Sequence, residues 1–179
     1  MSAMNLYLWQ EAASYSAQMH AGQFRNDRKT PYCAHPFRVA MTLRDLFGCN
    51  DHEAIAAALL HDIIEDTEAD YDDVLERFGA VVADAVADMT KDMRLREDLR
   101  EPAYDKGLLE GGWRGRLIKL ADVHDNLCDL SSSDKLGSMI EKCQRAIGIA
   151  KAASDDHPAI LCGIEHVEQL IANRTRETT

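Results

Sequence analysis

Apolar side chains recur along this chain at intervals of three and four residues, the spacing that places them on one face of an α-helix. No segment alternates residue by residue in the way that a half-buried strand does. The pattern predicts helices over about 6–22, 35–48, 53–66, 72–78, 81–90, 117–130, 136–153 and 158–172. We therefore expect an all-α fold, built as a helical bundle.

Polar and helix-breaking residues support several of these boundaries. Asp51 and Asp70 precede helices at positions where a side-chain oxygen can accept from free backbone amides, and Pro36 suits a first helical turn. The segment 91–112 is charged and only weakly periodic. We expect a mobile connection there, with one short helix near 103–109.

Length, composition and charge fit one globular domain. The chain has 179 residues, 46% hydrophobic and 28% charged, and single domains typically have roughly 100–200 residues. Its 31 acidic residues outnumber the 20 basic ones, giving a net charge of −11. This balance argues against nucleic acid or an anionic membrane surface as the main partner, while a local basic pocket for a small anion stays compatible with it. The longest apolar run, 54–60, is shorter than the roughly 20 residues of a membrane span, and the first residues lack the features of a secretory signal.

The chain has five scattered cysteines without any CxxC pair: Cys33, Cys49, Cys128, Cys143 and Cys162. A disulfide framework favours an even count in a small secreted chain, and a structural zinc site favours close pairs. We therefore expect reduced thiols and a cytoplasmic location.

The segment 58–67 combines an apolar helix with four polar side chains at its end. His61 and Glu65 are four residues apart, and so are Asp62 and Asp66, so on a continuous helix they form one patch. Charged groups among leucines and isoleucines would cost several kcal/mol, roughly, if buried without partners. A divalent cation offsets that cost, because imidazole nitrogen and carboxylate oxygen are metal ligands. The alternative is a solvated acidic helix end.

Two further residues favour the metal hypothesis. His35 opens a helix behind a Pro-Tyr turn, and Asp122 places a carboxylate on the otherwise apolar helix 117–130. Either residue alone is more simply interpreted as a hydrogen-bonded polar group at a helix boundary. With His61 and Asp62 they complete a set of two imidazoles and two carboxylates drawn from three helices.

The order His, His-Asp and a distant Asp resembles that of the HD-domain metal-dependent phosphohydrolases. The surrounding motifs are more specific and resemble the hydrolase domain of the RelA/SpoT homologues. They are Ala-Gly-Gln-Phe-Arg (21–25), Pro-Tyr-x-x-His-Pro (31–36), Ala-Leu-Leu-His-Asp-x-x-Glu-Asp-Thr (58–67), Phe-Gly (78–79) and Lys-Leu-Ala-Asp-x-x-x-Asn-Leu (119–127). In length the chain is similar to the stand-alone small alarmone hydrolases of the metazoan SpoT-homologue type.

The resemblance implies a single HD-type hydrolase domain over 1–179, with the motifs in about 5–130 and C-terminal helices over about 136–172. It implies an enzyme that removes the 3′-pyrophosphate from a nucleotide alarmone, (p)ppGpp or (p)ppApp, usually with Mn²⁺. Iron, cobalt and zinc suit the same ligand types. The alternatives are an HD phosphohydrolase acting on another nucleotide or nucleotide-cofactor phosphate, and a non-enzymatic domain with a structural ion or a bound nucleotide.

The resemblance also implies a role for each matching residue. The ion would be held by His35, His61, Asp62 and Asp122. Glu65 and Asp66 would orient the attacking water or carry its proton, because neighbouring carboxylates can have separated pKa values. Arg25 would contact the base or a phosphate, and Asn126 the ribose or the bridging phosphate. Without the family match, Arg25 is a solvated loop residue and Asn126 an ordinary helix-surface amide.

Several positions depart from the family pattern. Asn26 stands where a lysine is common, His124 and Asp125 replace a bulky pair, and Cys128 replaces an arginine. None of these departures removes a metal ligand, but they leave open the choice between guanosine and adenosine. The sequence also leaves open the native metal and the oligomeric state. A basic stretch would either face the 5′-phosphates or neutralise a surface: Lys91, Arg94, Arg96 and Arg100.

Overall fold

The computed structural model describes residues 7–130, 133–154 and 156–177. These residues form helices joined by loops, and the one isolated β-bridge among them joins Phe24 to Pro31. The predicted all-α class is therefore confirmed. Among the described residues, no helix has both the length and the apolar character needed to cross a membrane.

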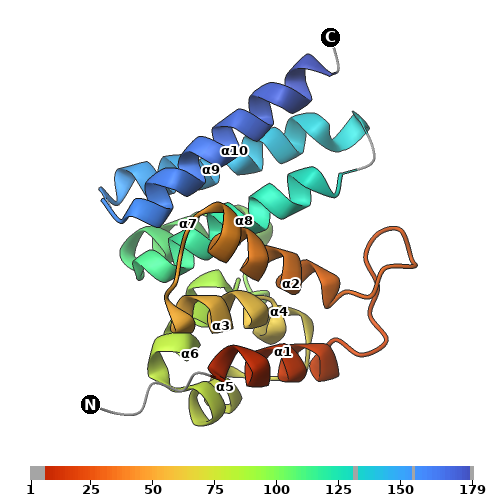
Figure 1. Cartoon of the computed structure of the whole chain (residues 1–179), viewed down its shortest axis with the longest axis vertical. Coiled ribbons are helices and arrows are strands. Elements are labelled where there is room, and N and C mark those ends of the chain that lie inside the picture. Colours follow the sequence, from red (N-terminus) through yellow and green to blue (C-terminus); the bar gives the residue numbers. More distant parts are fainter. Residues whose placement is uncertain (1–6, 131–132, 155, 178–179) are drawn as a thin grey trace.

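The helical elements follow one another along the chain as shown in Figure 1. They are α1 (Leu8–Met19), α2 (Ala34–Met41), the π-helical η1 (Thr42–Leu46), α3 (His52–Leu60), α4 (Ile63–Asp66), α5 (Tyr71–Phe78), α6 (Ala80–Met89), α7 (Glu97–Glu110), α8 (Trp113–Cys128), the 3₁₀-helical η2 (Ser133–Lys135), α9 (Leu136–Ala152) and α10 (Pro158–Arg176).

Helix α8 lies at the centre of the bundle. It packs against α9 and α10 on one side and against α2, α3 and α6 on the other. Figure 1 shows α9 and α10 together at one end of the molecule and α1, α3, α5 and α6 toward the other. Because α8 carries Asp122, this position places the carboxylate between the two groups of helices.

Helix α3 forms the inner wall of the second group. It is rich in alanine, and six of its residues, from Ala54 to Leu60, are buried. Small side chains let α1, α2 and α6 approach it closely. Two imidazoles, His35 and His61, are almost completely buried within this apolar core, which indicates specific polar partners.

Both predicted helix caps are present. Asp51 accepts a hydrogen bond from the Ala54 amide at 2.7 Å. Asp70 and Asp73 form a reciprocal capping box at the start of α5. Caps of this kind typically stabilise a protein by about 1 kcal/mol each.

The helix predicted over 53–66 is interrupted. α3 ends at Leu60 and α4 begins at Ile63, so that His61 and Asp62 lie at the junction. The His61 ring bonds the Ala58 carbonyl through Nδ1 at 2.8 Å, a side-chain contact that competes with the helical pattern. The prediction of one regular helix through His61 and Asp62 was therefore wrong.

The segment 91–112 is also more ordered in secondary structure than predicted, because Glu97–Glu110 forms the helix α7 despite Pro102 within it. Its only buried residues are Tyr104 and Leu108, so its apolar pattern is weak. Arg116 donates to the Leu108 and Gly111 carbonyls at the end of this helix. Such capping from another helix is invisible to local periodicity.

Candidate metal centre and active site

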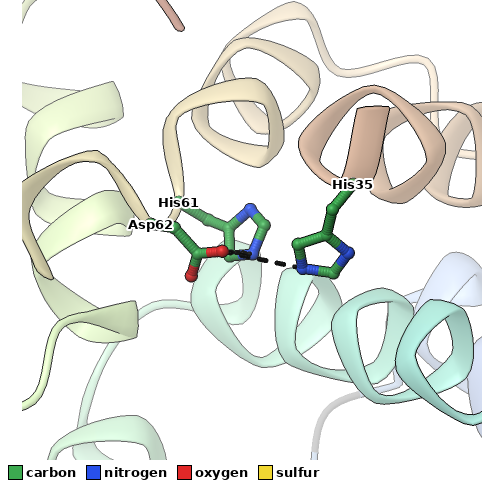
Figure 2. Close-up of side chains that lie close together, drawn as sticks. All are labelled: His35, His61 and Asp62. Atoms are coloured by element: carbon green, nitrogen blue, oxygen red, sulfur yellow. Dashed lines mark ion pairs between the residues drawn. The ribbon is translucent and has the colours of Figure 1, made fainter. Parts of the chain in front are cut away.

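Two imidazoles and one carboxylate meet between α2 and the α3–α4 junction. The possible ligand atoms of His35, His61 and Asp62 all lie within 4.8 Å of one another. Asp62 Oδ2 is 3.1 Å from His61 Nε2 and 3.6 Å from His35 Nε2. Figure 2 shows both rings turned toward this carboxylate. In the described part of the chain, this is the one group of three or more such residues close enough to hold an ion.

Asp122 approaches the same rings from α8. Its Oδ1 lies 3.2 Å from His35 Nε2 and 3.9 Å from His61 Nε2. The four residues predicted from the sequence as metal ligands are thus brought together from α2, the α3–α4 junction and α8.

Hydrogen bonds at the far side of each ring fix its orientation. His35 Nδ1 contacts Asp125 Oδ2 at 2.6 Å, and His61 Nδ1 contacts the Ala58 carbonyl oxygen at 2.8 Å. When Nδ1–H donates in this way, Nε2 is left to bind a cation, the usual arrangement at histidine metal sites. Among the described atoms, buried His61 Nε2 has no hydrogen-bond partner, since its contact with Asp62 is outside hydrogen-bond geometry. The donor set therefore fits a divalent metal ion.

The ionisation of these residues shows how much negative charge the site holds. Burial alone would lower the pKa of His35, but its bonds with Asp122 and Asp125 raise it to about 9. Burial would raise the pKa of Asp62, but the His61 charge and contact lower it to about 2. Protons on the imidazoles thus offset the negative charge of the carboxylates. A cation that binds the rings would displace these protons.

A second layer of contacts surrounds Asp122. Lys119 Nζ donates to its Oδ2 at 2.9 Å, one helical turn away, and Asn126 Nδ2 donates to its Oδ1. Arg25 Nη2 in turn donates to Asn126 Oδ1 at 2.8 Å, and Arg25 Nε pairs with Asp129 at 3.0 Å. The two residues predicted to bind substrate therefore lie beside the candidate metal ligands and contact each other.

Glu65 and Asp66 lie on α4, directly after the His61–Asp62 junction. Glu65 Oε2 accepts from the Lys91 amide at 3.1 Å, and burial raises the pKa of Glu65 despite this bond. Asp66 Oδ2 accepts from the Tyr32 hydroxyl at 2.9 Å. Burial, together with Asp62 and Asp66, raises the pKa of Tyr32, so the phenol stays protonated and donates.

Two adjoining cavities open from this site. The smaller, about 180 Å³, is lined by His35, Asp62, Glu65, Asp66 and Asp122, among others. The larger, about 560 Å³, shares six lining residues with it: Arg25, Lys91, Tyr104, Lys119, Asp122 and Asn126. Its outer wall belongs to α9 and contributes Lys142, Arg145 and an apolar surface that includes Met139 and Ile149. We call the larger cavity the α8–α9 cleft.

The predicted basic stretch divides into two parts. Lys91 lines both cavities. Arg94 pairs with Asp92 and Arg96 with Asp98, and both arginines are more than four-fifths exposed. Arg100 lies 3.9 Å from Glu101 and does not line either cavity.

Sequence reasoning missed the residues that act from outside the ligand set. Asp125, treated only as a departure from the family pattern, holds His35, and Arg38 holds Asp125 at 2.6 Å. Asp125 lies one helical turn after Asp122, so helical spacing was an available signal. The cations of α9 had no local signal, because only the packing of α9 on α8 brings them to the site.

This chain is similar in sequence and in fold to known proteins. The HD domain family matches residues 12–108. The guanosine-3′,5′-bis(diphosphate) 3′-pyrophosphohydrolase MESH1 of Drosophila melanogaster is 35% identical over 147 residues, covering 82% of each chain. The Homo sapiens protein of that name is 38% identical over 122 residues, covering 68% of each. A solved structure described as a metazoan ortholog of SpoT that hydrolyzes ppGpp aligns over 97% of this chain and 98% of its own, with a TM-score of 0.81 and 25% identity.

Proposed function

Since this chain belongs to the HD-domain family, and within it to the guanosine-3′,5′-bis(diphosphate) 3′-pyrophosphohydrolases, we propose that it is an enzyme that hydrolyses the 3′-pyrophosphate of nucleotide alarmones. The products are pyrophosphate and the remaining nucleotide. The observation that carries the proposal is the convergence of His35, His61, Asp62 and Asp122 beside Glu65, at the inner end of a large cleft.

The proposed cofactor is a divalent cation held by His35, His61, Asp62 and Asp122. When bound, such an ion polarises a phosphoryl oxygen and lowers the pKa of bound water. Two nitrogens and two carboxylates also suit iron, cobalt and zinc, so the ligand types alone do not select the ion. We propose Mn²⁺ on the basis of the family likeness.

The residues of α4 supply the proposed acid–base chemistry. Glu65 is half-buried, and burial raises its pKa toward neutral pH. A raised pKa makes the carboxylate a stronger base, which suits a group that accepts the proton of the attacking water. Asp66, on the same short helix and beside Asp62, is proposed to orient that water or to protonate the leaving group. Both carboxylates line the small cavity, where the reacting phosphate would lie.

The α8–α9 cleft is the proposed place for the rest of the nucleotide. Its volume of about 560 Å³ lies within the range of small-molecule sites, roughly 300–1,000 Å³. Lys142 and Arg145 provide positive charge for phosphate in an otherwise acidic protein. Arg25 and Asn126 lie where the cleft meets the metal site, and we propose that they contact the base or ribose and the 3′-phosphates.

Pyrophosphate release tests this function. Purified protein with Mn²⁺ and either ppGpp or ppApp should release pyrophosphate, and the ratio of the two rates defines the base preference. Glu65→Gln should lower kcat by about 10²–10⁴-fold, the range for a general acid or base. Glu68→Gln is the matched control, because Glu68 is exposed and lies outside both cavities.

One result would contradict the proposal: the absence of release from either alarmone by protein that demonstrably binds metal. If such protein instead releases orthophosphate from a different nucleotide or a dinucleotide cofactor, the broader HD phosphohydrolase class is favoured. We also propose a cytoplasmic location, which the five free cysteines support.

A further inference from the structure

The Tyr32 hydroxyl lies between two carboxylates of the site. It is 2.7 Å from Asp62 Oδ2 and 2.9 Å from Asp66 Oδ2. The first of these oxygens is the same atom that approaches His61 Nε2 at 3.1 Å. One phenol thus contacts both a proposed metal ligand and a proposed catalytic carboxylate.

The Tyr32 ring contacts His20 and Arg25, and its loop is hydrogen-bonded to the end of α4. It packs against the His20 ring at a tilt of 34°, with centroids 4.8 Å apart, and the Arg25 guanidinium lies 5.6 Å from its centroid. The Tyr32 amide donates to the Gln23 carbonyl, and the Gln23 side chain donates to the Asp66 carbonyl at 2.8 Å. The loop between α1 and α2 is therefore attached to the end of α4 by the side chains of Gln23 and Tyr32.

A shared donor is what this pair of carboxylates needs. Asp62 and Asp66 are four residues apart on a turn that also carries Glu65, so their negative charges repel. A hydroxyl has one proton and can donate to only one acceptor strongly at a time. Located between the two, it stabilises whichever carboxylate carries more negative charge and keeps the other within reach.

We propose that Tyr32 is a positioning residue, whose hydroxyl holds the Asp62 and Asp66 carboxylates in the arrangement required for metal binding and for hydrolysis. This inference rests on the proposed function, because it gives Asp66 a part in the reaction. Hydrogen bonds to metal-ligating carboxylates commonly change metal affinity or activity by about 10–100-fold when they are removed.

The substitution Tyr32→Phe tests the proposal, because it keeps the ring against His20 and removes only the hydroxyl. Affinity for Mn²⁺ alone, measured by electron paramagnetic resonance of the free ion, should weaken by about tenfold. The kcat for pyrophosphate release should fall by about 10–100-fold and stay low at saturating Mn²⁺, while KM changes by less than about threefold.

Tyr71→Phe is the matched control. Tyr71 donates to Asp84 Oδ1 at 2.7 Å, an equivalent tyrosine–aspartate bond on the surface of α5 and α6. Its loss should leave kcat, KM and Mn²⁺ affinity unchanged. Thermal unfolding of both variants reports the stability that such a bond contributes.

Unchanged Mn²⁺ affinity in Tyr32→Phe would overturn the proposal, whether or not the variant is less stable than the wild type. Full recovery of kcat at saturating Mn²⁺ would overturn the part that concerns Asp66. If the wild type binds Mn²⁺ and hydrolyses neither alarmone, the proposed function fails, and the affinity ratio still decides whether Tyr32 positions Asp62.

Discussion

Asp125 is the residue that fixes the His35 ring. Its Oδ2 lies 2.6 Å from His35 Nδ1, and the Arg38 guanidinium reaches both of its oxygens, at 2.6 and 2.9 Å. Burial would raise the pKa of Asp125, but the bonds with His35 and Arg38 lower it, so the carboxylate stays ionised. A negative second partner of this kind increases the basicity of the ring nitrogen that faces a metal.

Asp125→Asn should therefore weaken Mn²⁺ binding by about 10–100-fold. It should also lower the free energy of unfolding by about 1–3 kcal/mol, because His35 and Arg38 lose a charged partner. Metal titration and denaturant unfolding measure the two effects. Asp156→Asn, at an exposed aspartate in the loop before α10, is the control and should change neither quantity beyond about 0.5 kcal/mol. Equal Mn²⁺ affinity in wild type and Asp125→Asn would show that Asp125 does not orient the ring.

At the scale of elements, α6 and α8 approach each other closely where Asp88 of α6 faces Gly115 of α8. Asp88 of α6 accepts a hydrogen bond from the Gly112 amide at the start of α8, at 3.0 Å. A Cβ atom on Gly115 would lie 2.7 Å from Asp88 Cβ. The close approach of these two helices therefore requires the absence of a side chain at 115.

Gly115→Ala should destabilise the protein by about 1–3 kcal/mol, the usual cost of overpacking, although alanine favours a helix. Gly148→Ala on α9 is the matched control. Apart from its own stretch of helix, no described atom would lie within 4 Å of a Cβ there, so the free energy of unfolding should rise by up to about 1 kcal/mol. Denaturant unfolding gives both values, and a stabilised Gly115→Ala would contradict the packing described for α6 and α8.

Glu101 links α7 to the elements on either side of it. It accepts hydrogen bonds from Lys91 Nζ and from Arg145 Nη2 of α9. Burial opposes ionisation, but these two cations lower the pKa of Glu101 from 4.5 to about 2. The unfolded chain therefore takes up this proton before the folded protein does, so the stabilisation is complete above about pH 5 and is lost as the pH falls toward 2.

Glu101→Gln should make the unfolding free energy less dependent on pH over this acid range. The difference from wild type should be about 1 kcal/mol, because the pair is partly exposed and water screens it. Glu110→Gln, at an exposed glutamate near the end of the same helix, should keep the wild-type slope. Parallel curves for wild type and Glu101→Gln would exclude this link as a source of acid sensitivity.

Periodicity and capping were enough to predict most helices and the caps at Asp51 and Asp70, because both depend on neighbours within a few residues. The break at His61 was not predictable in this way, since it accompanies a ring that bonds the preceding turn and faces residues of α2 and α8. The same limit applies to α7, whose end is capped by Arg116 of the next helix. The candidate ligands could be proposed from residue type and order, whereas the carboxylate behind His35 required the packed structure.

At the scale of the whole molecule, a strongly acidic protein contains a cleft with clustered cations. The net charge is −11, yet Lys91, Lys119, Lys142 and Arg145 all line the α8–α9 cleft. Some of these cations are already paired, Lys119 with Asp122 and Arg145 with Glu101. Low-dielectric walls concentrate such charge and attract a multiply charged anion to the cleft.

Lys142→Ala should therefore raise KM for ppGpp by about fivefold, which corresponds to about 1 kcal/mol of lost binding. Mn²⁺ affinity should not change, because Lys142 is not among the residues that line the small cavity. Lys151→Ala is the control, since Lys151 pairs with Glu168 of α10 and does not line the cleft. Steady-state kinetics at low and physiological salt measure the effect, and an unchanged KM would place the phosphates elsewhere.

The wall that α9 adds to the cleft contains none of the four side chains proposed to hold the ion. The part of substrate recognition that is assigned to α9 is thus separate from the residues proposed for bond breaking. Replacements on the inner face of α9 can alter which molecule is accepted while leaving the cleavage apparatus intact. Directed evolution toward a new phosphorylated compound should accordingly begin with that face, because its residues are not among the proposed ligands or acid–base groups.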